Sequence, residues 1–162
     1  MSNTEIERKF LLDRLPEDIE QKPHNIIRQG YIVTDSSNEV RVRAKGSDYY
    51  LTIKQGNGLT RDEVEIPISE HQFNALWGLT AGKRVEKTRY DYADSGSLIE
   101  IDVYSGGLTP LKVAEVEFTS VDASRGYTIP SFFGREVTQD KSFKNASLAV
   151  KGMPDSYTKE LK

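Results

Sequence analysis

The chain has 162 residues, of which 36% are hydrophobic and 29% are charged, and its formal net charge is −3. This size and balance are typical of one soluble globular domain and argue against a general nucleic-acid binder, which carries a clustered basic excess. The sequence has no cysteine, which excludes disulfides and thiolate metal sites, and because it also lacks a secretory signal and a membrane-length apolar run, we expect a cytoplasmic protein without a membrane partner.

Short segments that alternate apolar and polar residues recur along the chain, separated by turns rich in Gly, Asn, Asp and Ser. Such alternation is typical of β-strands, and the short turns indicate consecutive hairpins in an antiparallel sheet. The pattern predicts eight strands, at residues 5–12, 26–33, 39–44, 48–55, 60–68, 84–93, 98–104 and 112–119.

Three stretches have helical spacing instead. Ser69 can cap a helix that places Phe73, Leu76 and Trp77 on one face. The other two are a short helical turn at residues 121–125 and a C-terminal helix at residues 140–150. Residues 153–162 are predicted to form a polar tail, so the single domain is predicted to span residues 1–152.

These elements predict a mainly β protein with some α. Because closure removes the exposed edges of a sheet, we expect an eight-stranded closed antiparallel β-barrel with a few flanking helices.

Alternate residues of a strand share one face, and on the polar face of these strands the charges are segregated by sign. Carboxylates recur in the pairs Glu5 and Glu7, Glu63 and Glu65, Glu100 and Asp102, and Glu115 and Glu117. Cations recur in the pairs Arg41 and Arg43, and Lys87 and Arg89. Any one strand with a solvated face could show such alternation, but segregation across the whole set favours a charged, water-filled interior.

The charged pairs indicate the kind of ligand. Arg41 and Arg43 have the residue type and spacing suited to forked recognition of phosphate oxygens. Carboxylates suit Mg²⁺, which binds protein carboxylates together with substrate phosphates. The sequence therefore predicts a phosphate-rich ligand bridged by a hard divalent metal ion.

The opening Glu5-x-Glu7-x-Lys9 resembles the signature of the CYTH superfamily, also called triphosphate tunnel metalloenzymes. Further segments resemble the remaining family motifs in order, at residues 41–43, 52–54, 60–65, 86–90, 100–103, 115–118 and 140–145. The resemblance covers residues 5–150 and is closest to short bacterial members that hydrolyse inorganic triphosphate. It implies an eight-stranded triphosphate tunnel with a C-terminal helix that plugs one mouth.

The resemblance also implies roles for individual residues. The implied triphosphate-binding residues are Lys9, Arg41, Arg43, Lys54, Lys87 and Arg89, with Arg61 on the same face and Lys144 of the plug helix as lesser candidates. The implied ligands of one or two Mg²⁺ or Mn²⁺ ions are Glu5, Glu7, Asp102, Glu115 and Glu117. The candidate catalytic residues are Lys9, Glu7, Glu117 and Tyr31.

Some of these assignments stay open in the sequence. Tyr31 either contacts substrate or fills the barrel. Glu63 and Glu65 either bind metal or neutralise neighbouring arginines, and for Glu100 we favour neutralisation. A homodimer is a family-level expectation only.

The leading hypothesis is metal-dependent hydrolysis of inorganic triphosphate to diphosphate and phosphate. The enzymatic alternatives are a class IV-type adenylyl cyclase and a thiamine or nucleoside triphosphatase. The only tryptophan, Trp77, is predicted to lie in a core rather than to stack on a base or thiamine. A polyphosphate-binding module is the non-enzymatic alternative, but such a module gains nothing from paired glutamates unless they hold metal.

Overall fold

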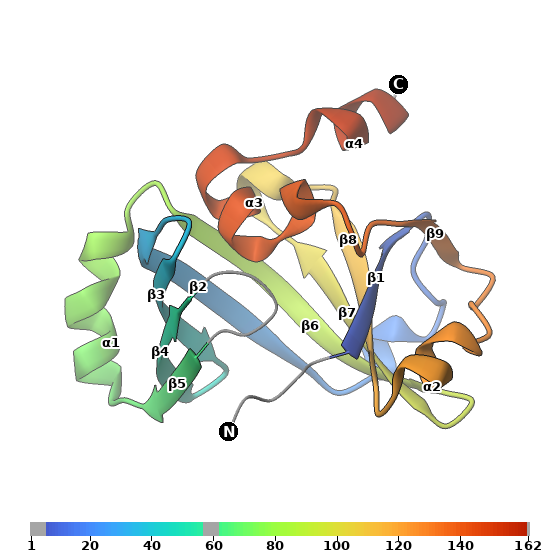
Figure 1. Cartoon of the computed structure of the whole chain (residues 1–162), viewed down its shortest axis with the longest axis horizontal. Helices are drawn as coiled ribbons and strands as arrows, with labels where there is room; N and C mark the ends of the chain where they lie inside the picture. The colour runs from blue at the N-terminus through green and yellow to red at the C-terminus, as the bar shows by residue number, and fades with distance from the viewer. Residues whose placement is uncertain (1–5, 57–61, 162) are drawn as a thin grey trace.

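The computed structural model describes residues 6–56 and 62–161, and Figure 1 shows the arrangement of its elements. The strands are β1 (Ile6–Leu12), β2 (His24–Thr34), β3 (Asn38–Lys45), β4 (Asp48–Gln55), β5 (Asp62–Pro67), β6 (Arg84–Asp94), β7 (Ser97–Tyr104), β8 (Lys112–Phe118) and β9 (Phe133–Glu136). They form one nine-stranded antiparallel sheet with the order β5-β4-β3-β2-β6-β7-β8-β1-β9. The mainly β, antiparallel prediction is confirmed.

The prediction of eight strands in a closed barrel is not confirmed. The sheet gains β9, which pairs with β1 through Phe10 and Leu12. In the described residues no hydrogen-bonded ladder joins β5 to the other end of the sheet. At the far end of the sheet, β9 occupies the Phe10–Leu12 part of the β1 edge opposite β8, so β1 is not the edge strand there.

Helix α1 (Glu70–Trp77) begins as predicted, at a capping box. Ser69 Oγ accepts a hydrogen bond from the Gln72 backbone N–H, and Gln72 Oε1 accepts one from the Ser69 N–H. Helix α2 (Val121–Arg125) is also where it was predicted. Four 3₁₀ turns occur in the described residues: η1 (Ile19–Gln21), η2 (Gly78–Thr80), η3 (Gly106–Leu108) and η4 (Lys141–Phe143). Within the described ranges, every helix is too short or too polar to cross a bilayer.

The C-terminal segment differs from the prediction. The single helix expected at residues 140–150 is divided into η4 and α3 (Asn145–Lys151). The expected polar tail carries a further helix, α4 (Asp155–Glu160), because it brings one aromatic side chain into the core. Tyr157 is buried, its ring lies against Phe143, and its hydroxyl donates to the Pro110 carbonyl. Helices α3 and α4 lie over one end of the space between the two halves of the sheet (Figure 1).

Among the residues that the structure describes, three apolar clusters surround a charged inner face of the sheet. One lies outside β1, β7 and β8 around Phe10 and Ile101, and a second lies under α1 around Phe73. The third fills the end covered by α3 and α4, where Tyr104, Phe143 and Leu148 pack together. The charged face is therefore closed at one end by apolar packing and left hollow beyond it.

Gly30, on β2, offers a test of how tightly the outer face is packed. A Cβ at this position would lie 2.5 to 2.8 Å from side-chain atoms of Thr80, which is fully buried. Thr80 cannot move freely, because its hydroxyl donates to the Trp77 carbonyl and accepts from Arg84. We expect Gly30→Ala to lower the free energy of unfolding by about 1–3 kcal/mol, measured by urea denaturation. Gly107→Ala is the control, because no heavy atom lies within 4 Å of the added Cβ; equal effects would contradict the packing argument.

Candidate active site

A cavity of about 410 Å³ lies on the charged face, and its lining is almost entirely polar. The predicted site residues that line it are Glu7, Lys9, Tyr31, Arg41, Arg43, Lys54, Arg89, Glu115, Glu117 and Lys144. Glu5 and Arg61 lie outside the described residues. Lys87 and Asp102 are brought to the same region but are buried behind the lining. Strand alternation thus placed most of the predicted set in one hollow.

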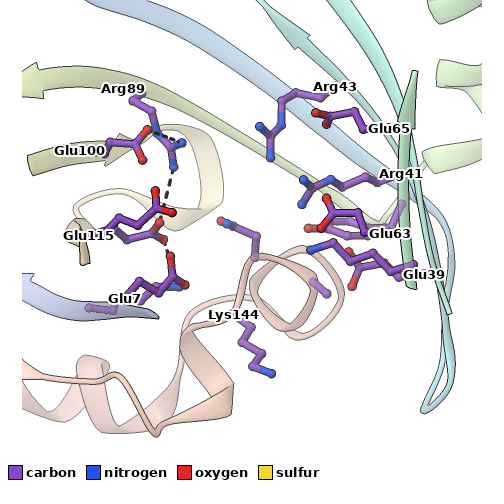
Figure 2. A pocket seen from close by; sticks show the side chains of 16 residues that line it. Glu7, Glu39, Arg41, Arg43, Glu63, Glu65, Arg89, Glu100, Glu115 and Lys144 are labelled. Carbon is purple, nitrogen blue, oxygen red and sulfur yellow. Dashed lines mark hydrogen bonds and ion pairs between the residues drawn. The ribbon is translucent and has the colours of Figure 1, made fainter. Parts of the chain in front are cut away.

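Figure 2 shows two walls that face one another across this cavity. One wall, from β1, β7 and β8, presents Glu7, Glu100 and Glu115, with Arg89 of β6 beside them. The opposite wall, from β3, β4 and β5, presents two arginines among glutamates. Its labelled members are Arg41, Arg43, Glu39, Glu63 and Glu65. Opposed walls of this kind can hold a polyanion on one side and its metal counterion on the other.

The acidic wall brings like charges directly opposite one another. Glu7 is the cross-strand partner of Glu117, and Glu100 is that of Glu115. Opposed carboxylates repel unless a cation lies between them. Arg89 supplies part of that charge, with Nη1 2.8 Å from Glu100 Oε2 and Nη2 4.0 Å from Glu115 Oε2. Lys9 Nζ lies 3.3 Å from Glu115 Oε1.

The donor set of this wall suits a hard divalent ion. Carboxylates projecting into a water-filled cavity leave coordination positions for substrate oxygens and water. Within residues 6–56 and 62–161, however, no three His, Asp or Glu side chains converge closely enough to hold a metal by themselves. Glu7, Glu115 and Glu117 therefore line the same cavity without converging on one point.

Asp102, one of the predicted metal ligands, does not line the cavity. It is fully buried, and both of its oxygens are taken by cations. Oδ1 accepts from Arg89 Nε at 2.7 Å, while Oδ2 accepts from Lys87 Nζ at 2.7 Å and Arg89 Nη2 at 2.8 Å. Lys87 is equally buried, with its ammonium 5.3 Å from the centre of the Tyr104 ring. The packing around Tyr104 covers this end of the charged face. This explains why Arg89 lines the cavity while Lys87 and Asp102 do not.

The charge states of this buried group follow from its contacts. Burial would raise the pKa of Asp102, but Lys87 and Arg89 outweigh it and hold that pKa at about 2. Burial lowers the pKa of Lys87, opposed by the charge of Asp102. Burial also acts to lower the pKa of Arg89, but its hydrogen bonds and charge contacts with Asp102 and Glu100 raise it overall. Asp102 is thus an ionised anchor for two cations.

On the opposite wall, as far as the structure describes the chain, Arg43 is hydrogen-bonded through its Nε, whereas the Nε of Arg41 is not. Arg43 Nε donates to Gln29 Oε1 at 2.9 Å, and Gln29 Nε2 donates to the Tyr31 hydroxyl. Burial, followed by the charges of Arg41 and Arg89, lowers the pKa of Arg43 to about 10. In the described part of the chain the buried Nε of Arg41 has no hydrogen-bond partner. The wall therefore holds two cations that repel one another, and one of them, Arg41, has a buried N–H group without an acceptor among the described residues.

Tyr31 both packs in the core and lines the cavity. Burial raises the pKa of its phenol, while the charge of Arg41 acts to lower it. Sequence reasoning missed Gln29 and Asn145, which also belong to the site or its support. The alternation Gln29-x-Tyr31 was a signal for the first, and the motif at residues 140–145 contained the second.

The CYTH domain family model matches residues 3–128, most of the chain. The chain belongs to the CYTH family. It is 47% identical over 150 residues to an inorganic triphosphatase of Nitrosomonas europaea, covering 91% of this chain and 97% of that protein. It is 33% identical over 147 residues to an inorganic triphosphatase of Acetivibrio thermocellus, covering 89% and 92%. The predicted resemblance is confirmed.

A solved crystal structure of an inorganic triphosphatase also resembles this CYTH protein. The two share a TM-score of 0.76 and 45% sequence identity, over 91% of this chain and 95% of that one. The similarity therefore extends from the motifs to the fold of the whole charged sheet.

Proposed function

We propose that this CYTH protein hydrolyses inorganic triphosphate to diphosphate and phosphate with the help of Mg²⁺ or Mn²⁺. The observation that carries the proposal is the cavity in which an acidic wall faces a wall that carries Arg41 and Arg43. Its volume of about 410 Å³ suits a compact polyanion with hydrated metal. The two relatives described above as inorganic triphosphatases support the same substrate.

The residues of the cavity divide into two roles under this proposal. Glu7, Glu115 and Glu117 would hold the metal, with Glu5 as a further predicted ligand. Bound metal would neutralise the phosphates and activate a water molecule. The cations would bind the phosphate oxygens and stabilise the charge that develops on the leaving diphosphate. These are Lys9, Arg41, Arg43, Lys54 and Arg89, with Lys144 at the helical end of the cavity and Arg61 as a further predicted contact.

Asp102 and Lys87 have supporting roles in this proposal. Asp102 binds the Arg89 guanidinium through both of its oxygens, which fixes the plane of the group facing the cavity. A guanidinium held in advance loses less freedom when it binds phosphate. We infer that Asp102 positions Arg89 instead of binding metal.

The lining of the cavity disfavours the enzymatic alternatives, an adenylyl cyclase and a thiamine or nucleoside triphosphatase. Adenine and thiamine need an apolar or aromatic surface on which to stack. Tyr31 is the one aromatic side chain that lines the cavity in the described residues, and it is itself buried. Trp77 packs against Phe73 in the cluster under α1, on the other face of the sheet, as its helical spacing predicted.

Phosphate release from inorganic triphosphate, ATP and thiamine triphosphate tests the proposal directly. We expect metal-dependent release from inorganic triphosphate, at least about tenfold faster than from the other two, and loss of release in chelator. Release restored by Mg²⁺ or Mn²⁺ would identify the effective ion. If triphosphate binds tightly but no phosphate is released, the protein is a cyclase or a polyphosphate-binding module, which cyclic AMP formation would distinguish.

Sedimentation measures the expected homodimer, and cell fractionation the expected cytoplasmic location. Both remain predictions of the sequence.

A further inference from the structure

Asn145, the first residue of α3, lies where the helix that closes the cavity meets the buried ions. It lines the cavity together with Lys144, and it also contacts two side chains behind the lining. Its Oδ1 accepts a hydrogen bond from the Tyr104 hydroxyl at 2.6 Å and one from Lys87 Nζ at 3.4 Å. The carboxamide therefore bridges the closing helix and the buried ion pair.

These contacts fix which way the carboxamide faces. A lysine ammonium has donors and no acceptor, so the group turned toward Lys87 must be the oxygen. The two lone pairs of Oδ1 are then used by Tyr104 and Lys87, both of which are buried. The amide nitrogen, Nδ2, consequently points away from them, and a flipped amide would place N–H groups against an ammonium.

Nδ2 is open to the cavity. Within the described ranges, no hydrogen bond has Nδ2 as its donor. Nδ2 is also not one of the buried side-chain atoms that lack a partner there, which are Arg41 Nε and Tyr127 Oη. An unpaired Nδ2 that is not among those buried atoms is in contact with solvent, and the solvent at this position is that of the cavity that Asn145 lines. Its two N–H donors are available to an acceptor that enters.

The surroundings of Nδ2 select an anionic acceptor. Lys9 reaches the same end of the cavity, since its Nζ donates to the carbonyl of Phe143 at 3.3 Å. Arg89 lies on the acidic wall of the same cavity, and Lys144 belongs to the helical side, although its side chain points away from the two walls (Figure 2). A neutral donor between cations, with its own oxygen already engaged, suits a phosphate oxygen.

We propose that Asn145 binds a terminal phosphate of the triphosphate through Nδ2, with Tyr104 and Lys87 holding the amide in that orientation. This inference rests on the proposed function, because it assigns one contact within the same site. It makes the start of α3 part of the substrate site and not merely a plug. Asn145 is therefore a substrate-binding residue that the charge pattern of the sequence does not mark.

Asn145→Asp separates this role from a structural one. Aspartate keeps an oxygen for Tyr104 and Lys87, so α3 stays anchored, but it replaces the N–H donors with a second acceptor. We expect the dissociation constant for inorganic triphosphate, measured by titration calorimetry, to rise at least about tenfold, with the melting temperature unchanged or higher. Asn145→Ala should weaken binding as well and should also lower the melting temperature, because it removes the anchor.

The controls keep the outcomes distinct. Asn74→Asp adds the same charge on the exposed surface of α1 and should leave binding unchanged. If only Asn145→Ala weakens binding, Asn145 is an anchor of α3 and the inference is wrong. If the unaltered protein neither binds nor hydrolyses triphosphate, the proposed function fails before the variants are compared.

Discussion

Arg41→Met is expected to lower kcat/KM for inorganic triphosphate by about 10²–10³-fold without lowering the melting temperature. The loss of activity follows from removing a guanidinium that can make two charge-assisted hydrogen bonds to phosphate. The stability should be preserved because the buried Nε of Arg41 has no partner in the described part of the chain, which costs about 1–3 kcal/mol in the folded state and offsets the loss of the hydrogen bond between Arg41 and Tyr31. Methionine keeps the apolar stem and removes that cost.

The neighbouring cations strengthen this expectation. Arg41 is one of the charges that, after burial, lower the pKa of Arg43, so the two guanidinium groups repel. Removing the Arg41 guanidinium removes this repulsion from Arg43, whereas a bound polyanion neutralises both guanidinium groups. We therefore also expect inorganic triphosphate to raise the melting temperature of the unaltered protein more than that of Arg41→Met.

Steady-state kinetics and thermal melts of the same preparations measure both parts. Arg28→Met is the matched control, because Arg28 lies over the Trp77 ring on the other face of the sheet, 4.6 Å from its centre. Its kcat/KM should stay within about twofold of the unaltered protein. Activity retained by Arg41→Met would show that Arg41 does not bind substrate.

The side-chain alternation of strands made the candidate site largely predictable. Arg41 with Arg43, and Glu115 with Glu117, fall on one face because the strand period is two residues. Their meeting in one cavity also depends on two pairings between strands far apart in the chain, β2 with β6 and β1 with β8. The strand period alone does not predict those pairings.

Depth along a strand was not predictable in the same way. Glu100 and Asp102 share a face of β7, but Glu100 lines the cavity and Asp102 is fully buried. The difference is set by Phe143 and its neighbours, which arrive from the far end of the chain to cover one end of the charged face. The strand pattern predicts which face of the sheet a residue lies on. It does not predict which distant segments of the chain pack against that residue.

The edges of the sheet escaped prediction for a related reason. Strand β9 has four residues, too few to show a period, and it exists because β1 offers it a free edge. Helix α4 likewise depends on one buried aromatic residue, Tyr157, within a polar segment. Both elements depend on tertiary contacts, which leave little signal in the local sequence.

Asp102→Ala should be the most destabilising single change at the site. It leaves the ammonium of Lys87, which is fully buried, without its counterion, and it frees the guanidinium of Arg89. Removing one partner of a buried ion pair costs about 3–5 kcal/mol. We expect that loss in the free energy of unfolding, together with a large fall in kcat. Glu100→Gln is the matched control, because Glu100 also pairs with Arg89 but is partly exposed, and it should cost less than about 1 kcal/mol.

The dependence of the free energy of unfolding on pH and on metal distinguishes two roles for Asp102, positioning Arg89 and binding metal. Its pKa falls from 3.8 to about 2 on folding, so its contribution to stability is complete above about pH 4 and is lost as the pH falls toward 2. The unaltered protein should therefore lose about 2 kcal/mol more than Asp102→Asn over that interval. The unfolding measurements are made in chelator. If Asp102 positions Arg89, it stabilises the protein even when no metal is bound. If Asp102→Asn matched the unaltered protein in chelator and fell behind it only with Mg²⁺ or Mn²⁺ present, Asp102 would be a metal ligand after all.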